Sequence, residues 1–213
     1  MTKTRNGTLF VVSGPSGCGK STLCSILTRD PELNLGLVVS HTSRPIRKTE
    51  ENGREYYFLS AQEFEKKKNE GFFLESAQVH GNFYGTPRDQ VENFLKAGLT
   101  VLLEIDVQGG LQVRQNFPEA VLVFVSPPTF ETLKERLHGR GTDAADVIEK
   151  RIHNAIEELQ QIPKYDYLVL NDQLDAAVED LKIIFLSESF KVSRLKLDEA
   201  FATMRLPGYC ERT

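Results

Sequence analysis

Gly14-Pro15-Ser16-Gly17-Cys18-Gly19-Lys20-Ser21 is an unbroken G-x-x-x-x-G-K-[ST] sequence. A short apolar run with β-branched residues, Leu9–Ser13, precedes it, and helical spacing of apolar residues over 21–29 follows it. Glycines let a backbone bend until successive N–H groups point at one anion, and the N-terminal end of a helix adds positive charge. A strand, this loop and a helix in that order are therefore typical of a P-loop that holds the phosphates of a nucleoside triphosphate.

Two side chains of the loop supply chemistry that the backbone lacks. The Lys20 ammonium group brings a positive charge to the β- and γ-phosphates, and the Ser21 hydroxyl is a suitable ligand for Mg²⁺. An ordinary glycine turn is the alternative interpretation, which the flanking strand and helix disfavour. The residues that we predict to bind the triphosphate are Gly14, Pro15, Ser16, Gly17, Cys18, Gly19, Lys20, Ser21 and Thr22.

The composition is that of an ordinary globular chain. It has 213 residues, of which 40% are hydrophobic and 26% charged, enough for one sizeable core. The net charge of −4 provides no basic field for a nucleic acid, and no apolar run approaches the ~20 residues that cross a bilayer. Cys18, Cys24 and Cys210 lack C-x-x-C spacing, and the N-terminus lacks the apolar stretch of a signal peptide. We expect reduced thiols, a cytoplasmic location, and neither a nucleic-acid nor a membrane partner.

Apolar runs alternate with helical patterns along the chain. The runs are Leu9–Ser13, Leu37–Ser40, Thr100–Asp106, Ala120–Ser126 and Tyr167–Leu170, and the helical patterns are Ser21–Arg29, Gln108–Asn116, Phe130–Leu137, Asp143–Gln161 and Leu174–Phe190. This alternation predicts an α/β fold whose core is a parallel, doubly wound sheet. Ligands of such sheets bind at the carboxyl ends of the strands, so we expect the P-loop to meet Glu104 and Asp106 there.

Residues 41–99 break the alternation with a segment rich in charged and aromatic residues. Short alternating runs at 55–59 and 72–79 indicate a small antiparallel insertion, and a capping box, S-x-x-E, precedes a charged helix at 61–70. A connection of this length between core strands is expected to bind a ligand.

Arginines and glycines gather again between residues 135 and 152, which indicates an arginine-bearing lid hinged on glycine. The chain is thus divided into a core of residues 1–40, 100–134 and 153–190, an insertion of 41–99, a lid of 135–152 and a C-terminal extension of 191–213. The sequence assigns no role to that extension.

Several further segments resemble the guanylate kinases, a family of P-loop nucleoside monophosphate kinases. The P-loop alone is unspecific, because many nucleotide-binding proteins share it. The segments that carry the resemblance are SHTSRPIRKTEENGREY at 40–56, FLESAQVHGNFYGT at 73–86, LEIDVQG at 103–109, RLHGRGT at 136–142 and VLND at 169–172. The resemblance runs in register from Leu9 to Phe190. It implies a P-loop core, a mixed or antiparallel insertion that binds the monophosphate, and a helical lid.

The resemblance also implies an activity: Mg²⁺-dependent transfer of the γ-phosphoryl group of ATP to GMP, and to dGMP. It assigns guanine recognition to Glu75, which accepts from N1–H and the N2 amino group, and to Ser40 and Thr86, which donate to O6. The chemistry agrees, because a carboxylate accepts from two adjacent donors and a hydroxyl donates to a carbonyl. Adenine lacks the N1–H and leaves such a carboxylate buried and unpaired.

Four residues are assigned by the resemblance to the phosphate of GMP: Arg44, Arg47, Tyr56 and Tyr84. Guanidinium groups offer planar, bidentate donors to phosphate oxygens, and each tyrosine offers one hydroxyl. We interpret Glu50 as orienting Arg47 or Tyr56, because a second negative charge would repel the phosphate.

The loop that carries these arginines departs from the usual family pattern at Ser43, Pro45 and Thr49. The departures keep the charges but leave the path of residues 44–50 open.

The strand ends hold acids and an amide with more than one interpretation. Asp106 either holds a Mg²⁺-bound water or contacts the acceptor nucleoside, and Glu104, two residues away on the same strand face, is a second candidate for the same roles. Asn171 and Asp172 either contact the adenine of ATP, as the resemblance implies, or cap the following helix.

Catalysis is assigned to positive charge. The resemblance implies that Arg136, Arg140 and Arg151 of the lid, together with Lys20, surround the transferring phosphoryl group. The acceptor oxygen is already an anion, so no general base is required. A catalytically inactive, protein-binding relative and a kinase for another nucleoside monophosphate are the alternatives. A monomer and a homodimer are both compatible with the sequence.

Overall fold

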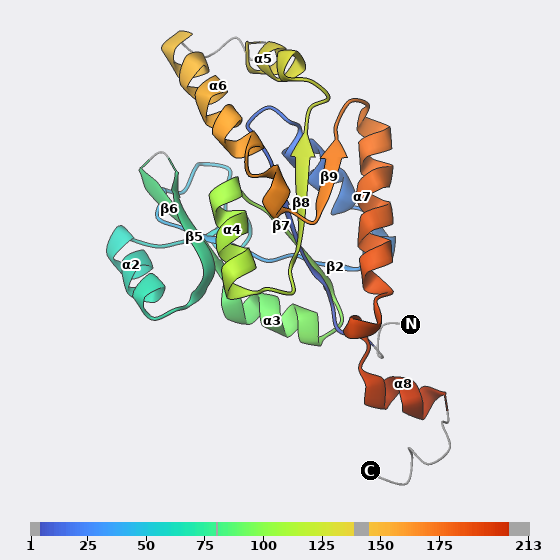
Figure 1. The fold of residues 1–213 in the computed structure, drawn as a ribbon. Coiled ribbons are helices and arrows are strands. Elements are labelled where there is room, and N and C mark those ends of the chain that lie inside the picture. The colour runs from blue at the N-terminus through green and yellow to red at the C-terminus, as the bar shows by residue number, and fades with distance from the viewer. Residues whose placement is uncertain (1–4, 80, 139–144, 205–213) are drawn as a thin grey trace.

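The computed structural model describes residues 5–79, 81–138 and 145–204, and its centre is a parallel sheet (Figure 1). In these residues the sheet has five strands in the order β2-β7-β1-β8-β9. The strands are β1 (Leu9–Ser13), β2 (Leu35–Gly36), β7 (Thr100–Glu104), β8 (Val121–Ser126) and β9 (Tyr167–Leu170). Every neighbouring pair is parallel, and β1 lies in the middle with all its residues buried.

Helices cover both faces of this sheet. Successive side chains of β1 point to opposite faces and therefore enter two different hydrophobic clusters. The helices are α1 (Lys20–Leu27), α3 (Arg88–Lys96), α4 (Val107–Asn116) and α7 (Leu174–Ser189). Phe10 and Val12 pack in a cluster with α1 and α7, while Leu9 and Val11 pack in a cluster with α3 and α4. The parallel, doubly wound α/β core that the sequence predicts is therefore confirmed.

A second, mixed sheet forms within residues 41–87, in the order β4-β3-β6-β5. Its strands are β3 (His41–Thr42), β4 (Tyr57–Phe58), β5 (Phe73–Val79) and β6 (Asn82–Pro87). β3 and β4 are parallel, and the other pairs are antiparallel. Helix α2 (Ala61–Asn69) covers this sheet by stacking Phe64 on Phe73 and Phe83. The capping box predicted at its start is confirmed in both directions between Ser60 and Glu63.

Helices α5 (Phe130–His138) and α6 (Ala145–Leu159) lie beyond the end of the core sheet toward which β8 and β9 point (Figure 1). They pack on each other through Leu133, Leu137 and Ala155. This places both helices over the carboxyl ends of the core strands, where parallel sheets bind ligands. Residues 139–144, which include Arg140, lie outside the described residues.

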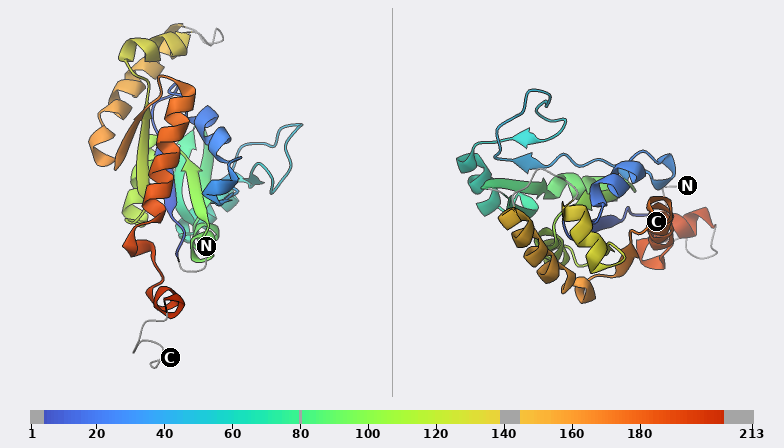
Figure 2. Two further views of the ribbon diagram at one scale, coloured as in Figure 1. Left: turned by 90° about the vertical axis from the view of Figure 1, so that its right-hand side faces the viewer. Right: turned by 90° about the horizontal axis from the view of Figure 1, so that it is seen from above.

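The C-terminal segment lies at the other end of the molecule from α5 and α6 (Figure 2). Helix α8 (Leu197–Thr203) follows η3 (Val192–Arg194), a short 3-10 helix. The 3-10 helices η1 (Pro31–Leu33) and η2 (Ile162–Lys164) lie earlier in the chain. An antiparallel bridge between Arg5 and Leu195 joins the segment to the start of the chain. None of the helices in the described ranges is both long and apolar enough to span a bilayer.

Three sequence-based expectations about elements need correction. The strand expected at Leu37–Ser40 is wrong, because the residues that pair with β7 are Leu35 and Gly36, and Leu37 is exposed. β7 ends at Glu104 instead of Asp106, because Asp106 is the N-cap residue of α4. Helix α3 was not expected at all, and it packs on the core although it falls within residues 41–99.

Candidate phosphoryl-transfer site

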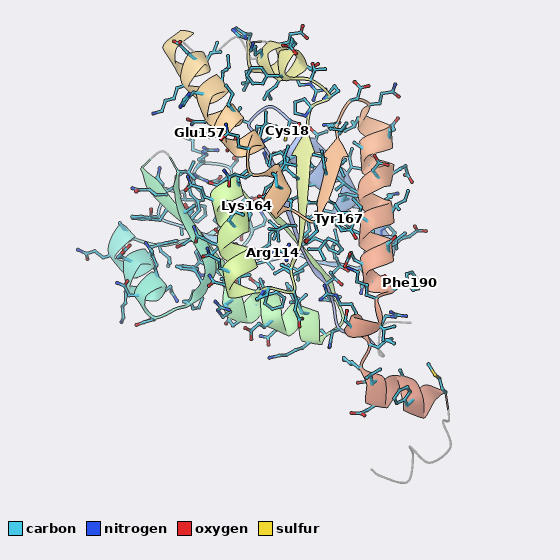
Figure 3. The ribbon with its side chains drawn as sticks, in the orientation of Figure 1. Cys18, Arg114, Glu157, Lys164, Tyr167 and Phe190 are labelled. Atoms are coloured by element: carbon cyan, nitrogen blue, oxygen red, sulfur yellow. The ribbon has the colours of Figure 1, made fainter. Side chains whose placement is uncertain are left out.

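The P-loop connects β1 to α1 at the carboxyl end of the sheet. Gly19 has a φ angle of 93°, a left-handed conformation that favours glycine, and it is the N-cap residue of α1. The Lys20 ammonium group bends back over the loop and donates to the carbonyl oxygens of Gly14 and Pro15. Cys18 lies near the upper end of β8, below α5 and α6 (Figure 3). The loop therefore opens toward the two helices of the predicted lid.

The acids at the strand end have different partners. The Ser21 hydroxyl donates to Glu104 Oε1 over 2.5 Å, which joins the P-loop helix to the end of β7. The Asp106 carboxylate instead accepts from the Gly109 N–H at 2.7 Å, as the cap of α4. Of the two acids, Glu104 is thus the one in contact with the predicted Mg²⁺ ligand Ser21.

A buried acid lies on the mixed sheet, on the opposite side of the same opening. Glu75 on β5 pairs in register with Thr86 on β6, and the Thr86 hydroxyl donates to Glu75 Oε1 over 2.6 Å. Only 6% of Glu75 is exposed. Burial raises the pKa of its carboxyl group to about 7, and the neighbouring Asp106 adds to the rise. Oε2 of Glu75 and Oδ1 of Asp106 both lie next to Gly109.

A cavity of about 360 Å³ separates the two sheets at this point. It is lined by predicted acceptor-site residues, namely Ser40, Tyr56, Glu75, Tyr84, Glu104 and Asp106. Thr86 lines an adjoining cavity together with Ser40 and Tyr56. The structure therefore brings together residues that are more than 60 positions apart in the chain, with carboxylate groups on both walls of the cavity.

The predicted partner of Glu50 is wrong. Its carboxylate forms a bidentate ion pair with the Arg44 guanidinium at 2.8 and 3.0 Å, and it accepts from the backbone N–H of Arg47 at 2.9 Å. The hydrogen bonds from Arg44 lower the pKa of Glu50. The Arg44 guanidinium carbon lies 5.7 Å from the Tyr56 ring centre, and the Tyr56 and Tyr84 rings are 5.9 Å apart. Arg44 and both tyrosines thus form one cluster, while the Arg47 side chain is exposed.

Of the three predicted lid arginines, the structure describes Arg136 and Arg151. Arg136 on α5 donates to the carbonyl oxygen of Asn171 at 3.1 Å, and Arg151 lies half-buried on α6. The Asn171 side chain is buried and donates to the carbonyl oxygen of Cys18 in the P-loop at 2.8 Å. The alternative role of Asn171 and Asp172 as helix caps is wrong, because the N-cap residue of α7 is Gln173.

Sequence reasoning missed Glu158, a half-buried acid on α6 that faces the P-loop. Burial raises the pKa of its carboxyl group, while the nearby Lys20 charge opposes the rise and Asp106 adds to it. Its position three residues after the buried Ala155 places it on the inner face of the helix. That spacing was the available signal for a carboxylate facing the site.

A P-loop that faces a strand-end acid and a second, base-sized cavity defines a P-loop kinase for a small phosphorylated substrate. A family model for guanylate kinase matches residues 6–188 of the chain. A guanylate kinase of Hahella chejuensis is 46% identical over 187 residues, which cover 88% of this chain and 89% of that protein. One from Dechloromonas aromatica is 45% identical over 200 residues, which cover 93% of this chain and 98% of that protein.

A solved structure agrees with these matches. The crystal structure of guanylate kinase from Anaplasma phagocytophilum has a TM-score of 0.72 and 29% identity, and the match covers 95% of this chain and 97% of that one. The chain therefore belongs to the guanylate kinase family. The family and the enzyme class that the sequence predicts, an ATP-dependent nucleoside monophosphate kinase, are confirmed.

Proposed function

We propose that the protein transfers the γ-phosphoryl group of ATP to GMP, and to dGMP, forming ADP and the guanosine diphosphate. The observation that carries the proposal is the buried Glu75–Thr86 pair, whose Glu75 faces the cavity between the mixed sheet and the end of β7. Thr86 occupies Oε1 of Glu75, and we assign Oε2 to donors on a ligand. The N1–H and N2 amino groups of guanine are such donors, whereas adenine offers an acceptor at N1.

The acceptor phosphate is assigned to the cluster of Arg44, Tyr56 and Tyr84, with Arg47 at its edge. Glu50 orients Arg44 through two parallel hydrogen bonds, and so holds the plane of the guanidinium group before the substrate binds. The remaining N–H groups and the tyrosine hydroxyls supply donors for phosphate oxygens. Ser40, on the wall of the cavity, is the hydroxyl that we assign to guanine O6, because the single hydroxyl hydrogen of Thr86 is donated to Glu75.

The transfer itself requires charge and alignment. A phosphoryl group moves through a loose transition state whose negative charge is spread over its oxygens. Lys20 and the amides of the P-loop hold the donor phosphates, and we assign Arg136, Arg140 and Arg151 to the transferring group. The phosphate oxygen of GMP is already ionised, so the residues move no proton. Closure of α5 and α6 over the site excludes the water that would otherwise hydrolyse ATP.

We assign the Mg²⁺ that this family implies to Ser21 and Glu104. Their direct contact at the P-loop gathers a hydroxyl and a carboxylate, which are the hard oxygen groups that Mg²⁺ prefers. Asp106 fits less well, because it is committed to the Gly109 N–H. Ser21 and Glu104 would hold the ion beside the triphosphate, where it would neutralise charge on the phosphates.

Glu104→Gln tests the choice between the two acids. The amide retains the shape and the contact with Ser21 but loses the charge. We expect the gain in ATP affinity that Mg²⁺ provides to fall by at least about 10- to 100-fold, because the loss of a charged ligand costs at least as much as a change to a residue that supports one. Calorimetric titration of ATP with and without Mg²⁺ measures this, and the Mg²⁺-free titration of the same variant serves as the control, because Glu104 also lines the acceptor cavity. An unchanged Mg²⁺ effect in Glu104→Gln, with a loss in Asp106→Asn, would reverse the assignment.

The raised pKa of Glu75 predicts pH-dependent binding of GMP. Guanine needs the ionised carboxylate, and the pKa of about 7 means that protons compete for it below that pH. Between pH 8 and pH 6 the ionised fraction falls about tenfold, so the KM for GMP rises about tenfold. Steady-state kinetics at both pH values, compared with Glu75→Gln, separate this effect from titration of the GMP phosphate. Equal pH profiles for parent and variant would remove Glu75 from the base site.

A coupled assay of ADP formation with GMP, AMP, CMP and UMP tests the proposed activity directly. We expect turnover with GMP to exceed that with each of the others by several orders of magnitude in kcat/KM. Equal use of another monophosphate would favour a different nucleoside monophosphate kinase. No turnover with any of the four, alongside intact GMP binding, would favour a protein-binding relative without activity.

We also propose the division of the chain into a core (1–40, 100–134 and 153–190), an insertion (41–99), a lid (135–152) and a C-terminal extension (191–213), with α3 of the insertion packed on the core. A cytoplasmic location is proposed on chemical grounds. Cys18 and Cys24 carry buried free thiols, which suits a reducing compartment.

A further inference from the structure

Asn171 follows the last strand of the core sheet, and its polar groups have definite partners. Its N–H donates to the carbonyl oxygen of Ser126 at 2.7 Å, which extends the pairing of β8 with β9 by one residue. Its side-chain Nδ2 donates to the carbonyl oxygen of Cys18 at 2.8 Å. Asn171 is only 6% exposed, so the rigid sheet fixes the position from which this amide holds the P-loop.

The Cys18 carbonyl belongs to the peptide unit that also contains the N–H of Gly19. In a planar trans peptide the C=O and the N–H point in opposite directions. Because the carbonyl points at Asn171, the Gly19 N–H points away from it. Within the described part of the chain this N–H has no hydrogen-bond acceptor. An unpaired loop N–H beside a helix N-terminus is the type of group with which a P-loop binds phosphate.

The contact between Asn171 and the P-loop also explains why residue 19 is glycine. A Cβ atom on Gly19 would lie 2.2 Å from Asn171 Nδ2, so any larger residue would displace the amide from the loop. The φ angle of 93° already favours glycine at this position. Two independent constraints therefore keep the Gly19 backbone against Asn171.

Asn171 is also joined to helix α5. Arg136 donates to its carbonyl oxygen at 3.1 Å. The α5 side chain Leu137 approaches the loop at Gly17, where a Cβ would lie 3.3 Å from a leucine methyl group. Asn171 thus lies between the P-loop and the first helix of the lid.

We infer that Asn171 is a positioning residue for the triphosphate: its amide fixes the Cys18–Gly19 peptide so that the Gly19 N–H faces the phosphates of ATP. The inference rests on the proposed use of the P-loop for ATP. It differs from the role that the family resemblance implies, a contact with adenine, because the amide donates to the Cys18 carbonyl oxygen within the protein. The two roles make different predictions for a ligand that has phosphates but no base.

The experiment compares ATP with inorganic tripolyphosphate, both with Mg²⁺, in calorimetric titrations of the parent protein, Asn171→Ala and Asn171→Asp. In Asn171→Ala the peptide is released, and we expect both ligands to bind about tenfold more weakly, the effect of one misaligned hydrogen bond to a charged group. Asn171→Asp places a carboxylate oxygen against the Cys18 carbonyl, so its loss is larger. GMP affinity changes less than twofold in both variants, which also shows that they are folded.

Asn116→Ala is the matched control. The Asn116 side chain likewise donates to a backbone carbonyl, that of Leu74 at 2.7 Å, but not in the P-loop. We expect it to lower the melting temperature without changing the affinity for tripolyphosphate. A loss for ATP alone would restore the adenine contact, and unchanged binding of both ligands in Asn171→Ala would overturn the inference. If the parent protein failed to phosphorylate GMP, the proposed function would fall, whereas the tripolyphosphate comparison would still test Asn171.

Discussion

Lys20→Ala is expected to lower the kcat for GMP phosphorylation by about 10³-fold or more while leaving the fold intact. The Lys20 ammonium group is the charged side chain of the loop itself, held above it by the carbonyl oxygens of Gly14 and Pro15. A phosphate chain that enters the loop offers the ammonium group stronger, charged acceptors than these carbonyls. Charge that builds up on the leaving β-phosphate then lacks the positive partner that the loop itself supplies in the parent protein.

The control is Lys66→Ala, which removes a lysine whose side chain is 77% exposed on α2. We expect this variant to keep the parent kcat. Circular dichroism and the melting temperature of Lys20→Ala show whether its core is retained, because Lys20 contributes no side chain to either of the two main hydrophobic clusters. Turnover near the parent level in a folded Lys20→Ala protein would remove the P-loop from the reaction.

Much of the core was predictable because its signals are local. The run at Leu9–Ser13 is apolar without interruption, as expected for a strand buried on both faces, and all five residues are buried. Short edge elements carry weaker signals. The segment at Leu37–Ser40 is at least as apolar as Leu35–Gly36. Nevertheless it is Leu35 and Gly36 that pair with β7, because the neighbouring strand sets the register. Helix α3 was missed because its apolar face is short: Val91 and Leu95 are buried, and Phe94 packs against the same cluster.

The candidate site was predictable to the extent that single positions carry motif information. Glu75 and Thr86 were assigned to guanine from motifs, and the structure pairs them across two strands. Contacts between motifs were not predictable in the same way. The bond from Asn171 to Cys18 joins residues 153 positions apart, and it depends on how β9 packs beside β8. Glu50 pairs with Arg44 because the loop after β3 folds back on itself. The spacing of residues in the sequence does not determine the path of such a loop.

Glu75→Gln is expected to raise the KM for GMP by about 10²- to 10³-fold, while the KM for ATP changes less than twofold. The hydroxyl of Thr86 donates to Oε1, so the variant amide keeps its carbonyl oxygen there and turns its NH₂ group to the position of Oε2. Two donors on guanine then meet a donor instead of an acceptor. Steady-state kinetics with each substrate varied in turn measure both constants, and Glu92→Gln on α3, whose carboxylate pairs with Lys96 and does not line the cavity, is the control.

The same exchange has two further consequences that a merely structural role would not produce. Adenine accepts at N1, so the NH₂ group of the variant suits it better than the carboxylate does. Turnover of GMP falls while turnover of AMP rises, so the ratio of GMP to AMP turnover decreases.

The stability of the variant is expected to change in the opposite direction to its activity. The pKa of Glu75 rises from 4.5 unfolded to about 7 folded, so at pH 8 the buried charge costs up to about 3 kcal/mol that glutamine does not. Denaturant unfolding at pH 8 should therefore show Glu75→Gln to be at least as stable as the parent. A Glu75→Gln protein that fails to bind GMP because it is unfolded would contradict the assignment. The assignment requires a variant that is at least as stable as the parent and binds guanine more weakly.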